Sequence, residues 1–145
     1  MILLDTNVVS EPLRPAPEAR VIEWIDAQPL ETLYLSAITV AELRAGVALM
    51  PAGRRCDKLH DYVERDLLPS FAGRVLPFDL ACTNAYAKVL KTAKRAGSGI
   101  ETADALIAAV ATANGFIVAT RDFSPFQAAG LIVINPWSNY SPLSA

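Results

Sequence analysis

The stretch Met1-Ile2-Leu3-Leu4-Asp5-Thr6-Asn7 opens the chain and decides how we expect it to fold. Its apolar run ends abruptly on a carboxylate. A short buried strand that stops at an acid directs that side chain beyond the edge of its sheet. We therefore expect Asp5 to lie at a sheet edge, and further acidic side chains that reach the same edge would form a site with it.

Short apolar segments alternate with helical segments along the rest of the chain. We expect strands at residues 2–4, 33–35, 74–78, 116–120 and 131–134. We expect helices at residues 18–27, 36–50, 54–68, 79–95 and 102–113, and a connector at 69–73. The segment at 8–17 is expected to begin as a helix or turn and then to become a loop, because three prolines break it. Because parallel strands need crossovers and bury both faces, this alternation predicts an α/β fold with three layers. A central parallel sheet of about five strands would be flanked by helices in one domain, residues 1–145.

Capping residues are expected to define three of these helix ends. Ser36 or Thr39 is a candidate N-cap for the second helix, and Asp79 is one for the helix that ends near Arg95. Gly115 follows the helix that begins near Thr102 and is expected to end it in a left-handed conformation.

Composition narrows the class of protein. The 145 residues carry a net charge of −2 and a pI near 5.3, which argues against binding nucleic acid through a broad basic surface. The longest apolar run, Ala105–Ala111, is far shorter than the roughly 20 residues of a membrane span. No basic segment precedes the first apolar run, and Cys56 and Cys82 belong to no CxxC motif. We expect a cytoplasmic protein with two reduced thiols and no association with membranes.

Four acidic residues are expected to converge at one edge of the sheet. Asp5 and Asp122 follow the strands at 2–4 and 116–120, so both face the carboxyl edge. Glu42 lies early in the helix after the second strand, and Asp104 lies in the first turn of a helix that runs back along the sheet. Both helices therefore begin at the carboxyl edge, where α/β proteins bind their ligands.

Close carboxylates raise one another's pKa, and a hard divalent cation relieves that repulsion. Oxygen ligands without a His or Cys cluster favour Mg²⁺ or Mn²⁺ over zinc. One or two such ions could activate water for phosphodiester hydrolysis. Each acid taken alone could instead cap a helix or lie on its surface. Asp104 argues for a metal site rather than for a cap or a surface position, because it interrupts an apolar run. Burying an unpaired charge there costs several kcal/mol in order of magnitude.

Four ordered motifs resemble the PIN domain, and more narrowly the VapC-type toxins and their FitB-like branch. They are Leu3–Ser10, Ile38–Leu43, Ala103–Ala109 and Val118–Asp122. The resemblance covers nearly the whole chain, including Leu76–Asp79 and Asn135–Trp137. It implies a three-layer PIN-like fold and the toxin of a type II toxin-antitoxin pair.

The resemblance also implies an activity and its residues. The activity is that of a Mg²⁺- or Mn²⁺-dependent endoribonuclease. Asp5 and Asp104 would be the central metal ligands, and Glu42 and Asp122 would complete the shell. Thr6 and Thr120 match polar positions that help to orient the site, although either hydroxyl could simply cap backbone. The family usually forms homodimers and is blocked by a small antitoxin with a DNA-binding domain, so operator DNA would be bound only through the complex.

Other charged and aromatic residues carry weaker expectations. Candidates for contact with RNA phosphates, each also readable as a solvated surface charge, are Arg14, Arg44, Lys94, Arg95 and Arg121. Arg121 is best placed among them, because it adjoins Asp122. We expect helix-terminus roles for Glu11 and Glu101, a surface position for His60, and packing or interface roles for Trp24 and Trp137.

Two other functions remain as alternatives. A haloacid-dehalogenase-like phosphatase also places a nucleophilic Asp after its first strand, but it needs a second Asp two residues later, where this chain has Asn7. A non-catalytic PIN scaffold that acts with an antitoxin in operator binding and transcriptional control is the stronger alternative. Intact acids argue against such a decayed enzyme without proving turnover.

Overall fold

A computed structural model describes residues 1–138 and confirms the expected α/β architecture. The sheet has five strands in the order β3-β2-β1-β4-β5, and every pairing is parallel. The strands are β1 (Ile2–Leu4), β2 (Leu33–Ser36), β3 (Val75–Leu76), β4 (Ile117–Ala119) and β5 (Val133–Ile134). All five therefore end at one carboxyl edge.

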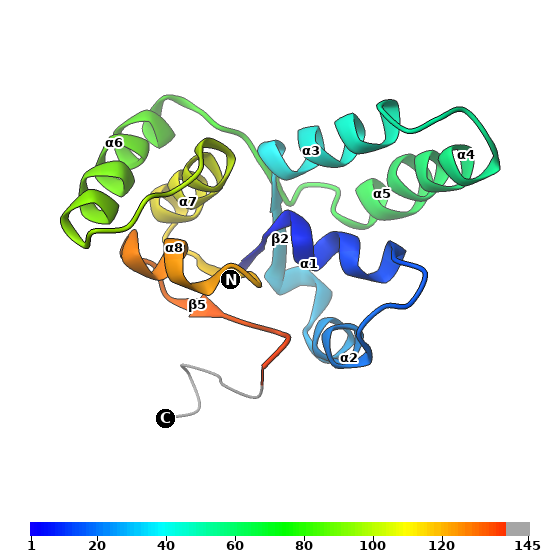
Figure 1. Ribbon diagram of the computed structural model, residues 1–145, viewed down its shortest axis with the longest axis horizontal. Coiled ribbons are helices and arrows are strands. Elements are labelled where there is room, and N and C mark those ends of the chain that lie inside the picture. The colour runs from blue at the N-terminus through cyan, green and yellow to red at the C-terminus, as the bar shows by residue number, and fades with distance from the viewer. Residues whose placement is uncertain (139–145) are drawn as a thin grey trace.

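Helices cover both faces of this sheet and form the outer two layers. On one side lie α6 (Leu80–Arg95), α7 (Thr102–Asn114) and α8 (Phe123–Ala128). On the other lie α1 (Thr6–Ser10), α2 (Ala19–Ala27), α3 (Ala37–Ala48), α4 (Arg54–Asp61) and α5 (Leu68–Ser70). Figure 1 shows the two groups to the left and right of the central strands.

Successive residues of β1 face opposite layers, which is why each side has its own core. Leu3 packs with Ile107 and Phe126 under α6, α7 and α8. Leu4 packs with Val8 and Leu43 under α1 and α3. Because both faces of the central strands are buried, their sequences are continuously apolar rather than alternating.

The expected helix ends are confirmed. Ser36 caps α3 by accepting a hydrogen bond from the Thr39 amide at 3.1 Å. Asp79 caps α6 by accepting one from the Cys82 amide at 3.2 Å. Gly115 ends α7 with φ of 69°, a left-handed conformation that glycine adopts without a Cβ penalty.

Residues 8–17 are more helical than expected, and several strands are shorter. Helix α1 is followed directly by a 3-10 turn at Glu11–Leu13, because Pro12 lies in the first positions of that turn, where no amide donor is needed. The strands expected at 74–78, 116–120 and 131–134 lose residues at their ends. Another 3-10 turn, Leu30–Thr32, leads into β2.

The amphipathic segment at 54–68 is helical but not uniformly so. Helix α4 continues into a π-helix at Tyr62–Leu67 and then into α5. The expected connector at 69–73 was therefore wrong at its start, because Pro69 lies in the first turn of α5, where its missing amide is tolerated. Val63 and Leu67 of the π-helix are buried against the α3 side of the core.

Within residues 1–138, every helix is too short or too polar to cross a lipid bilayer.

Candidate metal centre

Asp5 is held at the carboxyl edge by bonds to its backbone and to both oxygens of its side chain. Its amide donates to the Ala119 carbonyl at 2.9 Å, which extends the pairing of β1 with β4 by one residue. Its Oδ1 accepts from the Thr6 amide at 2.7 Å, so Asp5 is also the N-cap of α1. Its Oδ2 accepts from the Thr120 hydroxyl at 2.7 Å. With 3% of its surface exposed, this carboxylate is fixed in one orientation.

Three of the four expected acids present their oxygens to one another. One carboxylate oxygen from each of Asp5, Asp104 and Asp122 lies within 4.8 Å of the others. Asp5 is buried, Asp104 half-buried and Asp122 exposed, so the cluster opens to solvent on one side. Asp104 reaches it from the first turn of α7, as the direction of that helix predicts.

Glu42 lies at the rim of this group rather than within it. Its Oε1 accepts a hydrogen bond of 2.6 Å from the Thr6 hydroxyl. It shares the lining of an opening of about 320 Å³ with the three aspartates, Thr6, Asn7 and Ser10. The expected convergence of the four acids at one edge is therefore confirmed, with Glu42 reaching the site from its side.

The two threonines expected beside the acids bond to them directly. The Thr120 hydroxyl donates to Asp5 and accepts from the Asp122 amide at 2.9 Å, and Thr120 is fully buried. The Thr6 hydroxyl contacts Glu42 and lies 3.2 Å from the hydroxyl of Thr39. Each hydroxyl therefore ties an acid to the end of a strand or helix.

Asn7 is a site residue that the sequence reasoning missed. Its Nδ2 lies 3.4 Å from Asp122 Oδ2 and 3.5 Å from the Thr120 hydroxyl, and its Oδ1 accepts from the Arg121 amide at 3.3 Å. The signal was available, because Asn7 lies two residues after Asp5 in a helix that begins at the site. Its amide connects the β1 and β4 ends of the centre.

Burial and mutual repulsion raise the pKa of two of these acids. Burial raises the pKa of Asp104 to about 6, and the negative charges of Asp5 and Asp122 add to that rise. Burial also raises the pKa of Asp5, while the hydrogen bond from Thr120 opposes the rise. Around neutral pH the centre therefore concentrates negative charge that it cannot neutralise with protons alone.

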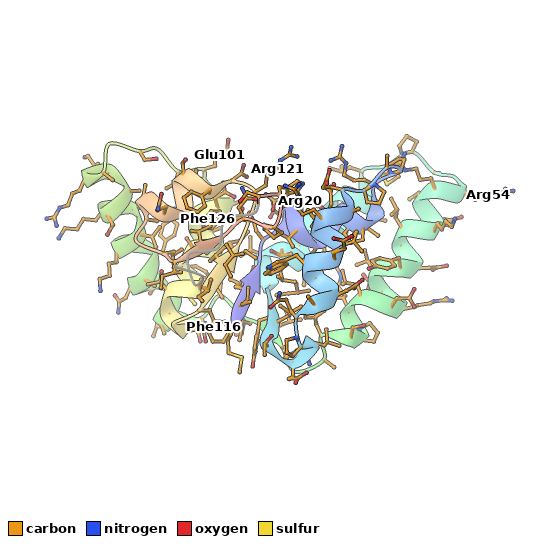
Figure 2. The ribbon with its side chains drawn as sticks, turned by 90° about the horizontal axis from the view of Figure 1, so that it is seen from below. Arg20, Arg54, Glu101, Phe116, Arg121 and Phe126 are labelled. Atoms are coloured by element: carbon orange, nitrogen blue, oxygen red, sulfur yellow. The ribbon has the colours of Figure 1, made fainter. Side chains whose placement is uncertain are left out.

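Two cations, Arg20 and Arg121, contact Trp137. The Arg121 guanidinium lies 5.3 Å from the centre of the Trp137 ring, and Arg20 Nη1 donates to the Trp137 carbonyl at 3.0 Å. Figure 2 shows Arg20, Arg121 and Glu101 along one edge and Phe116 on the opposite edge. Trp137 thus has a packing role, as expected, and its ring lies against Arg121, the residue before Asp122.

The remaining candidate cations differ in their surroundings. Arg44 forms a two-bond pair with Glu64 at 2.8 and 3.0 Å. Arg14 lies 3.4 Å from both oxygens of Glu11. Lys94 and Arg95 are exposed in the last turn of α6.

Glu11 and Glu101 lie at helix ends, as expected. Glu11 is 3% exposed, begins the 3-10 turn, and accepts from the Glu18 amide at 3.2 Å. Glu101 precedes α7, accepts from the Ala105 amide at 2.9 Å through its carbonyl, and adds its charge to the repulsion that raises the pKa of Asp104.

The other expected surface and core positions are also confirmed. His60 is exposed beside Asp61, and Trp24 packs against the core on the α3 side. Cys56 and Cys82 are both free thiols.

The chemistry of these ligands fits a divalent cation. Three carboxylates offer oxygen atoms at compatible spacing, and the part of the chain that the structure describes adds no His or Cys to that group. Hard cations prefer oxygen ligands, and a bound positive charge would offset the repulsion that raises the pKa of Asp104.

The sequence of this chain is similar to those of three known proteins over nearly its whole length. The chain is 67% identical over 137 residues to the plasmid stability protein StbB of Pseudomonas syringae pv. tomato, covering 94% of this chain and 99% of that protein. It is 58% identical to the VapC ribonuclease Y4jK of Sinorhizobium fredii, covering 94% and 98%. It is 54% identical to Toxin FitB of Neisseria gonorrhoeae, covering 94% and 99%.

Solved structures share the fold. The crystal structure of FitAcB from Neisseria gonorrhoeae matches with a TM-score of 0.91 at 54% identity, over 94% of this chain and 99% of that one. A structure of FitAB bound to an IR36 DNA fragment matches with a TM-score of 0.94 at 51% identity, over 98% and 99%. The family described as PIN domain matches residues 2–130. By sequence, fold and the convergence of its acids, this chain belongs to the PIN-domain family.

Proposed function

We propose that this chain is the toxin of a type II toxin-antitoxin pair and a metal-dependent endoribonuclease that hydrolyses phosphodiester bonds in RNA. The observation that carries the proposal is the meeting of Asp5, Asp104 and Asp122 oxygens within 4.8 Å at an open sheet edge. The names of two relatives, VapC ribonuclease and Toxin FitB, support the activity and the biological role.

Each acid has a proposed role in the site. Asp5 and Asp104 hold Mg²⁺ or Mn²⁺, and Asp122 and Glu42 complete the shell directly or through water. The bound cation would activate water and stabilise negative charge on the phosphate. Thr120 keeps both Asp5 and the Asp122 backbone in place, since it bonds to each.

Thr6 and Arg121 complete the proposed set. The Thr6 hydroxyl directs Glu42 toward the opening. Arg121 lies beside Asp122 with its guanidinium over the Trp137 ring, where it can contact a phosphate of the substrate.

We further propose that a small DNA-binding antitoxin binds this chain and that operator DNA is contacted only through the complex. The structure of FitAB bound to a DNA fragment supports this partnership. We propose that residues 1–145 act as one domain in the cytoplasm, as a homodimer.

The test is cleavage of RNA by the purified chain, with and without chelator. We expect cleavage that needs Mg²⁺ or Mn²⁺ and is lost in Asp5→Asn and Asp104→Asn proteins whose folding is verified by circular dichroism. Asp26→Asn, at an exposed position of α2, is the matched control and should cleave normally. Cleavage by the Asp5 and Asp104 variants at the wild-type rate would refute the assignment. A folded wild type that binds the antitoxin without cutting RNA would support the non-catalytic scaffold.

A further inference from the structure

The second half of α6 carries four cations between residues 88 and 95. They are Lys88, Lys91, Lys94 and Arg95, and all four are exposed. Neither Asp nor Glu occurs from residue 80 to residue 100, although acids outnumber cations in the whole chain. We call these four residues the α6 track.

Helical spacing places these cations along one side of α6. Lys88, Lys91 and Arg95 are separated by three and four residues, so they are neighbours on the helix surface. Lys94 follows Lys91 by three residues and widens the same stripe. Figure 2 shows side chains with blue nitrogen ends that extend outward from α6. The first half of the helix, Leu80–Ala87, holds no charged residue, so the positive charge is confined to the second half.

Stabilisation of the helix end accounts for only part of this charge. Lys94 and Arg95 lie in the last turn, where positive charge stabilises the C-terminus of a helix. Lys88 and Lys91 lie before that turn, and the effect fades within a turn. Among residues 1–138, none of the four forms an ion pair with an acid. The α6 track therefore presents positive charge that the fold itself does not use.

The α6 track leads away from the metal centre along the outside of the molecule. Helix α7 begins beside the centre, with Asp104 in its first turn, and a short connector that ends at Glu101 joins it to α6. Lys88 lines the same opening as Gly115, at the far end of α7, so the two helices run in opposite directions. Figure 1 shows α6 as the outermost helix on its side, with α7 between it and the sheet. Arg95 is therefore at the end of the track nearer to the acids.

We propose that the α6 track binds the phosphate backbone of the RNA outside the metal centre. A strand that leaves the centre passes Arg95 and Lys94 and continues past Lys91 toward Lys88. At about 1.5 Å per residue these cations span about 10 Å along the helix, which is room for more than one phosphate. Because the contact is to the backbone, it does not depend on base sequence. This inference rests on the proposed nuclease function and deepens it by assigning a second surface that contacts the substrate.

The composition of the α6 track favours a polyanion over a protein as its partner. Among the exposed residues from 87 to 97, Leu90 is the one large apolar side chain. Protein interfaces depend on clustered anchors in desolvated pockets, which this helix surface lacks. The small residues Ala87 and Ala96 leave the cations accessible. The net charge of −2 is consistent with this partner, because a short local track needs no broad basic surface.

The experiment compares a Lys91→Gln, Lys94→Gln double variant with an Arg54→Gln, Arg65→Gln control. Each removes two positive charges from exposed positions of helices, where glutamine has a propensity close to that of lysine and arginine. Figure 2 shows Arg54 at the end of the molecule opposite to α6. Binding of a fluorescent single-stranded RNA dodecamer is measured by anisotropy in chelator over a range of salt concentrations. Cleavage with Mn²⁺ then gives kcat and KM for the dodecamer and for a trinucleotide.

The α6 variant should bind the dodecamer more weakly, and the slope of log affinity against log salt should fall by about 1.4, or about 0.7 for each lost phosphate contact. Its KM for the dodecamer should rise while kcat changes little, because neither lysine touches the reacting atoms. A trinucleotide occupies only the centre, so its KM should stay at the wild-type value. The control and a Lys91→Arg, Lys94→Arg variant, which keeps the charge, should retain the wild-type slope within about 0.3, less than half of one contact. Circular dichroism establishes that each variant is folded.

Other outcomes separate the possible failures. Equal affinity, salt slope and KM in the α6 variant and the wild type would overturn the assignment of the track while leaving the nuclease intact. A KM that rises equally for the trinucleotide would show that the variant disturbs the centre itself, and would also overturn it. Unchanged RNA binding with weaker binding of the antitoxin or of operator DNA by the complex would assign the track to another partner, with the same consequence. A wild type that neither binds nor cuts RNA would instead remove the proposed function on which the inference rests.

Discussion

Replacing Asp104 with asparagine should stabilise the metal-free protein at neutral pH. The folded carboxyl has its pKa raised from 3.8 to about 6 by burial and by the charge of Asp5. At pH values between 3.8 and about 6, the folded state binds more protons than the unfolded state. The free energy of unfolding therefore falls as the pH rises through this range. Above pH 6 the free energy of unfolding carries the full cost of keeping Asp104 ionised in the folded state. Asparagine removes this cost, because it stays neutral.

The magnitude follows from the shift in the Asp104 pKa. A rise to about 6 corresponds at most to about 3 kcal/mol, at about 1.4 kcal/mol per unit. Because Asp104 keeps partial contact with water, solvent screening reduces this to about 1 to 2 kcal/mol. For a chain of this length that raises Tm by about 3 to 8 °C.

Thermal unfolding in chelator is the assay, at pH 7.5 and again near pH 4, where the difference should shrink. Added Mn²⁺ should raise the Tm of the wild type much more than that of Asp104→Asn, since binding stabilises the folded state. Asp26→Asn controls for a change of charge at an exposed site, with less than about 0.5 kcal/mol expected. A metal-free Asp104→Asn protein that melts below the wild type at pH 7.5 would refute the reasoning.

Three further outcomes test how the centre is held. Thr120→Val removes the buried hydroxyl that Asp5 and the Asp122 amide share, so we expect about 1 to 3 kcal/mol lower stability and about 10-fold weaker Mn²⁺ affinity by calorimetry; unchanged affinity would exclude a supporting role. Thr6→Val frees Glu42, and we expect slower cleavage with Tm changed by only a few degrees; normal kcat would show that this bond is dispensable. Chelation should lower the Tm of the wild type near pH 7.5, since it removes the cation that offsets the charge of the acids; an identical melt with EDTA and with Mn²⁺ would argue against a bound cation.

Local patterns in the sequence were sufficient to predict much of the fold. Continuous apolar strands separated by amphipathic helices require a parallel sheet covered on both faces, and the five strands follow from that. The caps Ser36 and Asp79 and the left-handed Gly115 were also predictable, because each acts within a few residues of itself. Segment 54–70 was harder, since a π-helix and a proline in the first turn of α5 leave no clear periodic signal.

The sequence was sufficient to predict that the acids converge, but not how each of them is bonded. The direction of each element brings Asp5, Asp104 and Asp122 to one edge, and that follows from alternation alone. The position of Glu42 at the rim, bonded to Thr6, depends on how α3 packs against α1, which no local pattern encodes. Asn7 was missed for the same reason, because its contacts with Asp122 and the Arg121 amide cross from one strand end to another.

By itself the sequence determined the class of fold and the edge at which the acids lie, and it predicted oxygen ligands for a divalent cation. These follow from periodicity, strand direction and ligand type, which are properties of short segments. Only the tertiary structure decided which oxygens approach within 4.8 Å, how the two threonines hold them, and that Asn7 contacts Asp122 and the Arg121 amide. Those features depend on contacts between residues far apart in the chain, whose distances are fixed by packing.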